Sequence, residues 1–179
     1  VAIWLGSNSI GFLAVLALLC TLGFTAFGGG LSYCIGFESE DKIPGATIAG
    51  ILLAGGFSLA EFYGVNASWF EVFKDGAFWV GTFVAGIGML IISAKWYTKE
   101  EQKRHMPYLL RQILTFLVLA GSMYAGVMIN NGTLLYIGTA FMMLFIIEKL
   151  YEIAPENVLS YGVLTLALGS AAIYGAFWY

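Results

Sequence analysis

The sequence predicts an all-α integral membrane protein, a compact bundle of about six transmembrane helices. Two observations carry this prediction. The 179 residues are 60% hydrophobic and only 11% charged, whereas charged residues make up about a quarter of a typical globular chain. The charges also cluster between long apolar runs, most of them near the roughly 20 residues that a membrane-crossing helix needs. The surplus apolar side chains must therefore face lipid or other membrane-embedded chains.

The first half of the chain contains three of the expected spans, at approximately residues 10–37, 43–65 and 76–94. The first run is longer than one straight crossing and contains Gly28-Gly29-Gly30, so we expect a helix that is tilted or kinked at this triplet. Pro44 suits the first turn of the second span. Residues 66–75 mix aromatic and charged side chains and are expected to form a separate amphipathic segment in the membrane interface.

The second half contains the other three spans, at approximately residues 108–129, 133–147 and 158–179. A basic segment precedes them, and within it Thr98-Lys99-Glu100-Glu101 matches a capping box that should start a short helix ending before Pro107. Asn130-Asn131-Gly132 is a strong turn signal, so the fourth and fifth spans should form a helical hairpin. No segment is left over for a second domain, and we expect residues 1–179 to form one transmembrane domain.

The distribution of basic residues predicts how the chain is oriented. Seven of the eight lie in or beside the links 38–42, 95–107 and 148–157. By the positive-inside rule, these links face the cytoplasm, or the matrix or stroma of an organelle, and both termini face the opposite side. The membrane would be a bacterial inner membrane or an organelle membrane. The expected topology anchors, which should also contact lipid headgroups, are Lys95, Lys99, Lys103, Arg104 and Arg111.

Two acidic residues near opposite mouths of the predicted bundle are the candidate functional groups. Glu61 lies about one turn from the end of the second span, where an ionisable group is a functional hypothesis by default. It could line a polar path, or it could simply reach the interface or pair with Lys74. Glu148 closes the inner end of the fifth span, as part of either a gate or an interfacial salt-bridge cluster with Lys149 and Glu152.

Small residues repeat every four positions in several spans. Such faces let helix backbones approach closely, so we expect them to pack within the bundle, against other membrane subunits or against further copies of this chain. Membrane lipid is the other expected partner. The repeats are Ala46, Gly50 and Ala54 in the second span, Gly81 and Ala85 in the third, Gly121 and Ala125 in the fourth, and Ala167, Ala171 and Gly175 in the sixth.

The sequence contains no arrangement of residues typical of an enzyme or a cofactor site. The one histidine, His105, makes haem or copper ligation a poor fit, and the net charge of −3 gives nucleic-acid binding no support. No catalytic, metal or cofactor residue is predicted, although lipid or pigment could lie between helices without leaving a motif. The mid-span polar groups are hydroxyls and phenols, among them Ser58, Thr82 and Ser122, and hydroxyls that bond to their own helix need no function.

Two loose resemblances bear on function. The glycine-rich first pair of spans and the segment Phe145 to Thr165, FIIEKLYEIAPENVLSYGVLT, resemble those of the small amide and urea channels, which share the layout of six short spans. The same C-terminal third resembles multi-spanning bacterial membrane proteins of no assigned activity. The central spans match neither group, so no functional residue is carried over.

The first hypothesis for function is therefore a non-catalytic accessory subunit of a larger membrane assembly. It rests on the small-residue faces and on the absence of a charged path through the predicted spans. The alternative, which the channel resemblance implies, is a channel or facilitator for a small neutral or weakly acidic solute.

Overall fold

A computed structural model describes residues 7–29, 32–65, 67–95, 97 and 107–153 of the chain. It is mostly helical, and four of its helices are long and apolar enough to cross a membrane. The chain divides into two units, Val1–Met142 and Met143–Tyr179. In chain order the elements are α2 (Asn8–Thr21), β1 (Phe24–Gly29), β2 (Ser32–Phe37), η1 (Glu40–Lys42), α3 (Ile43–Phe62), α4 (Ser68–Gly76), η2 (Ala77–Gly81), α5 (Thr82–Ser93), α7 (Tyr108–Met128) and α8 (Gly132–Ile153).

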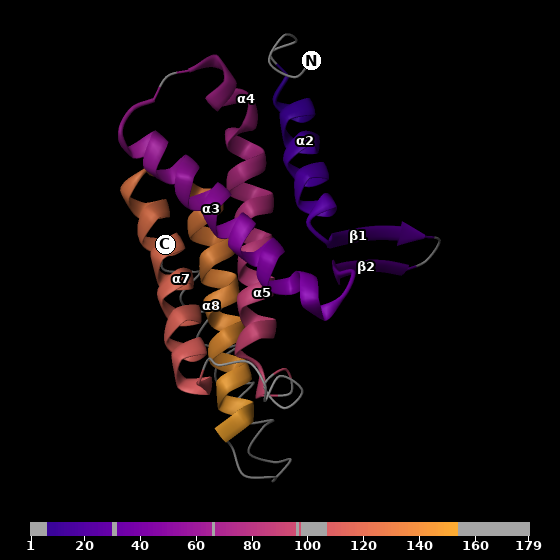
Figure 1. The fold of residues 1–179 in the computed structure, drawn as a ribbon. Coiled ribbons are helices and arrows are strands. Elements are labelled where there is room, and N and C mark those ends of the chain that lie inside the picture. Colours follow the sequence, from indigo (N-terminus) through magenta and orange to yellow (C-terminus); the bar gives the residue numbers. More distant parts are fainter. Residues whose placement is uncertain (1–6, 30–31, 66, 96, 98–106, 154–179) are drawn as a thin grey trace. The chain divides into compact units, whose positions relative to one another are not determined.

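The predicted first span, residues 10–37, is not one helix in the structure, and a short hairpin interrupts the otherwise helical fold there. Helix α2 ends at Thr21, and two antiparallel strands follow it with Phe24 opposite Phe37 (Figure 1). Gly23 stops the helix because its φ of +101° is a left-handed conformation that favours glycine. Its carbonyl accepts a hydrogen bond from the Glu38 backbone N–H at 2.9 Å, which closes the base of the hairpin.

The amphipathic segment is likewise not separate from the third span. Helices α4, η2 and α5 form one continuous 26-residue helix, Ser68–Ser93. It begins earlier than predicted because Phe70 and Val72 are buried, and because Gly11 of α2 and Gly76 of α4 let these two helices come into close contact. The middle of the helix is the five-residue π-helical segment η2.

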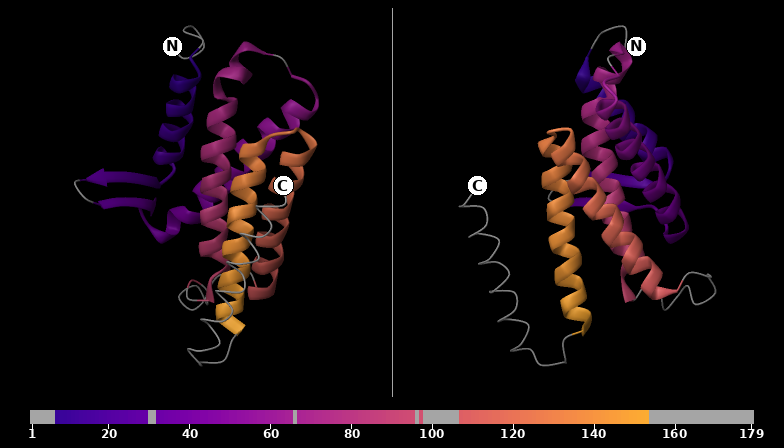
Figure 2. Two further views of the ribbon diagram at one scale, coloured as in Figure 1. Left: turned by 180° about the vertical axis from the view of Figure 1, so that it is seen from behind. Right: turned by 90° about the vertical axis from the view of Figure 1, so that its left-hand side faces the viewer.

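The Ser68–Ser93 helix is the central element of the first unit. Its most apolar stretch is 67% buried, against 28% for α3 and 22% for α7. Helices α2, α3 and α7 all pack against it, and α3 crosses it obliquely (Figures 1 and 2). The core at this crossing is built from Val15, Leu19, Phe24, Ala46, Val80 and Val84.

The remaining spans agree with the predictions to different degrees. Helices α3 and α7 match the second and fourth expected spans within three residues at each end, and the turn at Asn130-Asn131 connects α7 to α8 as expected. Helix α8 continues to Ile153, past the predicted end at 147, since Lys149 lies between Glu148 and Glu152 and supports another turn of helix. The predicted span at 158–179, both chain termini and most of the basic segment lie outside the described residues.

Candidate functional site

The site begins with the close contact between α3 and α5. A Cβ atom added to Gly50 would lie 2.7 Å from the Gly81 carbonyl oxygen and 2.9 Å from the Ala85 backbone nitrogen. The small-residue faces of the second and third predicted spans therefore meet each other, as expected for packing within the bundle. Gly88 continues this contact toward the Ser93 end of α5, where an added Cβ would collide with the Thr47 side chain.

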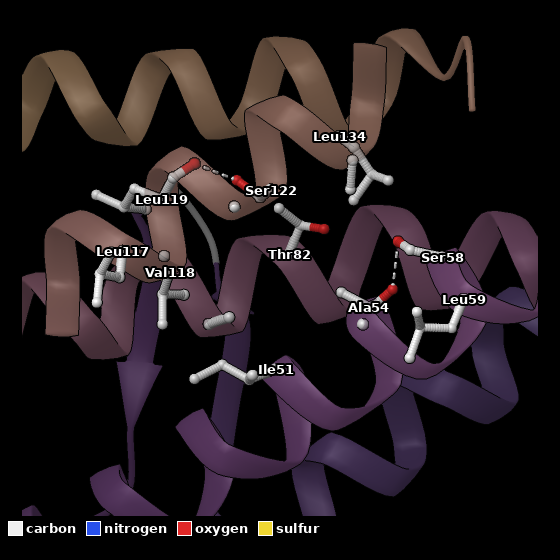
Figure 3. Close-up of a pocket in the computed structure, with 15 residues that line it drawn as sticks. Ile51, Ala54, Ser58, Leu59, Thr82, Leu117, Val118, Leu119, Ser122 and Leu134 are labelled. Carbon is white, nitrogen blue, oxygen red and sulfur yellow. Dashed lines mark hydrogen bonds between the residues drawn. The ribbon is translucent and has the colours of Figure 1, made fainter. Parts of the chain in front are cut away.

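Helix α7 forms the remaining wall of a cavity beside this crossing. The cavity has a volume of about 300 Å³ and lies between α3, α5 and α7, with Leu134 of α8 at one end (Figure 3). It opens to the surface beside Leu59 and Leu117, which are 61% and 58% exposed. Its walls are mainly aliphatic side chains and glycines, and none of the described residues that line it is charged. Gly55 and Gly121 are among the lining residues, and a Cβ atom added to either one meets no described atom within 4 Å.

Three hydroxyl groups line the otherwise apolar cavity. The Ser58 hydroxyl donates to the Ala54 carbonyl at 2.7 Å, and the Ser122 hydroxyl donates to the Leu119 carbonyl at 2.8 Å. Thr82 differs from both. Thr82 is only 4% exposed, and its hydroxyl has no hydrogen-bond partner among the described residues. Figure 3 shows the Thr82 side chain projecting into the space between Ser58 and Ser122.

The local backbone accounts for this difference. Thr47, Thr115 and Thr139 all bond to the carbonyl four residues earlier in their own helices, which is the usual arrangement for a hydroxyl inside a helix. Thr82 instead follows the π-helical segment directly. A π-helical turn contains more residues than an α-helical turn, so the carbonyls behind Thr82 are displaced from their usual positions. The sequence predicted a hydroxyl at this depth but not that it would lack a partner.

Glu61 is not among the described residues that line the cavity; it belongs to a small charged group in the last turn of α3, just beyond Leu59. The Lys74 ammonium group lies 3.4 Å from a Glu61 carboxylate oxygen and 3.2 Å from one of Glu71. Of the alternatives drawn from the sequence, the structure therefore contains the pairing with Lys74. The Glu61 carboxylate is held in this ion pair, and no described contact connects it to the cavity.

In the second unit, Glu148 belongs to a similar ionic group. Lys149 lies 3.4 Å from Glu148 and 3.0 Å from Glu152, and its ammonium group lies over the Phe145 ring at 5.5 Å from the ring centre. These pairs run along one helix and resemble the interfacial salt-bridge cluster that the sequence suggested.

The predicted topology anchors are only partly described. Lys99, Lys103 and Arg104 lie outside the described residues, while Lys95 is exposed at the end of α5. Arg111 differs from the expectation of headgroup contact, since only 3% of its surface is exposed. Its guanidinium lies 5.9 Å from the centre of the Tyr97 ring, and the same turn of α7 is tied to α5 by Gln112, which donates to the Ser93 carbonyl at 2.6 Å.

The arrangement as a whole can bind an apolar molecule and offer it one hydrogen-bond donor. Within the described ranges, no three histidine, cysteine, aspartate or glutamate side chains come together as a metal site. Comparison with other proteins adds no assignment: no protein-family model, curated protein or solved structure matches this chain.

Proposed function

We propose that this chain is a non-catalytic, multi-pass membrane protein that acts as an accessory subunit of a larger membrane assembly. Four helices of sufficient length and apolar character support the membrane location. The basic links would face the cytoplasm, matrix or stroma. The partner would be a transmembrane helix, either of another subunit or of a second copy of this chain.

The observation that carries this proposal is an outward-facing hollow on α3. Gly56 is exposed, and a Cβ atom added to it meets no described atom within 4 Å. Leu52 and Leu59 flank it on the same face of the helix and are 69% and 61% exposed. A glycine inside a helix costs roughly 0.5–1 kcal/mol relative to alanine. A partner helix packed into the hollow would offset that cost by close backbone contact.

The proposal is tested by filling the hollow. The full chain carrying Gly56→Leu is expressed in its native membrane, extracted in mild detergent and compared with the unmodified chain by native gel electrophoresis and co-purification. We expect the assembly that contains the chain to dissociate, because the new side chain occupies the partner's position.

Leu13→Phe is the matched control, since it adds bulk to a side chain of α2 that is already 60% exposed. It should leave the assembly intact. The proposal fails if the unmodified chain purifies alone as a monomer, or if Gly56→Leu leaves the assembly unchanged.

The second candidate function is a facilitator for a small neutral or weakly acidic solute. The cavity with its three hydroxyls favours it, whereas Glu61, which would mark the mouth of the path, is already paired with Lys74. Liposomes containing the purified chain would test it through the flux of short amides and short carboxylic acids. A rate no higher than that of empty liposomes rejects this candidate.

A further inference from the structure

We propose that the cavity between α3, α5 and α7 binds an uncharged, membrane-soluble molecule through a ring carbonyl that accepts a hydrogen bond from Thr82. The chemical class is that of a quinone, an apolar ring carrying carbonyl oxygens. This inference does not depend on the assembly role proposed above.

The unpartnered hydroxyl is the first argument. Buried polar groups in proteins are almost always hydrogen-bonded, and an exception calls for a missing partner. The hydroxyls of Ser58 and Ser122 have already donated their hydrogens to carbonyls of their own helices. Among the described residues that line the cavity, Thr82 is therefore the one whose hydroxyl hydrogen has no acceptor. Thr82 lacks an acceptor within hydrogen-bonding distance, and a carbonyl oxygen of a bound molecule would supply one.

The depth of Thr82 decides which molecules could supply that acceptor. At 1.5 Å per residue, Thr82 lies about 21 Å from Ser68 and about 16 Å from Ser93, near the middle of its span. The hydrocarbon core of a bilayer is roughly 30 Å thick, and the polar groups of phospholipids lie outside it. Phospholipid ester carbonyls are therefore too far away. The acceptor must belong to a molecule that dissolves in the hydrocarbon itself.

The walls of the cavity restrict the ligand further. The described residues of these walls carry no charge, so an ionised ligand would find no counter-charge among them, at a large desolvation cost. The volume of about 300 Å³ is at the lower end of the range for small-molecule sites, which suits a single substituted ring. Gly55 and Gly121 leave open space on opposite walls, in α3 and α7, where a planar ring can approach the backbone.

The test uses the full chain in phospholipid nanodiscs with radiolabelled decyl-benzoquinone as the probe. Empty nanodiscs correct for probe dissolved in lipid. We expect saturable binding that Thr82→Val weakens about fivefold to tenfold, the value of one lost neutral hydrogen bond, and that Thr82→Ser retains. Thr139→Val is the matched control, because Thr139 bonds to its own helix and does not line the cavity. It should bind the probe like the unmodified chain.

Two further measurements separate the hydrogen bond from simple apolar binding. The carbonyl stretching band of bound decyl-benzoquinone should shift to lower frequency in the unmodified chain and return toward its position in lipid in Thr82→Val. Gly121→Leu should abolish saturable binding, because the leucine side chain fills the cavity.

The proposal is overturned if Thr82→Val binds the quinone as tightly as the unmodified chain and the carbonyl stretching band has the same frequency in both. That result would show an apolar cavity that does not use its hydroxyl. It is also overturned if the folded chain shows no saturable binding, which would mean that the cavity holds lipid chains or water only.

Discussion

Replacing Gly50 with alanine would place a methyl group in the contact between α3 and α5. The new Cβ would lie 2.7 Å from the Gly81 oxygen and 2.9 Å from the Ala85 nitrogen. Both are backbone atoms of a helix, so neither can rotate away as a side chain would. The two helices must separate by several tenths of an ångström. Such overpacking costs about 1–3 kcal/mol, while alanine returns about 0.5–1 kcal/mol of helix propensity.

The net expectation for Gly50→Ala is a loss of about 0–2.5 kcal/mol in the free energy of unfolding, centred on about 1 kcal/mol. Gly56→Ala on the same helix is the matched control, because its new methyl group meets no described atom within 4 Å. It should gain the helix propensity without the clash and leave stability equal or slightly higher. Unfolding of both variants by sodium dodecyl sulfate from mild detergent micelles, followed by circular dichroism, measures the difference. A Gly50→Ala chain as stable as Gly56→Ala would refute the α3–α5 contact.

Two further predictions use the same unfolding measurement. Lys74→Gln should destabilise the chain by about 0.5–1 kcal/mol, since Lys74 pairs with both Glu61 and Glu71 near the surface. The loss should shrink in high salt because screening weakens the pairs in the unmodified chain, and an effect independent of salt would argue against it. Gly23→Ala should cost about 1–2 kcal/mol, because the residue has a φ of +101°. Gly36→Ala, with no described atom near the new methyl group, should cost less than 0.5 kcal/mol, and equal effects of the two would refute the reasoning.

The spans that could be predicted from the sequence are those bounded by clear signals. Pro44 marks the start of α3, Pro107 precedes α7, and Asn130-Asn131 ends it. The hydropathy of residues 10–37 shows no comparable boundary between one element and the next. A continuous apolar run is compatible with either helix or strand, and only the conformation of Gly23 decides between them.

The cavity was less predictable, for a local reason. Thr82 was one hydroxyl among several at mid-span, and a helix normally satisfies such a group from its own carbonyls. Whether the helix satisfies the hydroxyl depends on the turn that precedes the residue. No residue type in Ala77–Gly81 predicts that this turn is π-helical. The contact of Gly50 with Gly81 was easier to predict from the sequence, because the spacing of small residues indicates a close helix contact. The spacing does not indicate which helix is the partner.

The hairpin of β1 and β2 has a consequence for what must surround the protein. Two paired strands leave an open edge on each side, with backbone N–H and C=O groups that need hydrogen bonds. Hydrocarbon cannot supply them, so water, headgroups or another protein must meet these edges. Phe24 at the base of the hairpin contacts Phe83, the neighbour of Thr82 in the middle of the Ser68–Ser93 helix, with the two ring centres 6.4 Å apart. If that helix crosses a bilayer, water and headgroups lie too far from this level, and the strand edges would need hydrogen bonds from another protein segment. Helix α2, about 21 Å long with its 14 residues, is too short to cross a bilayer by itself.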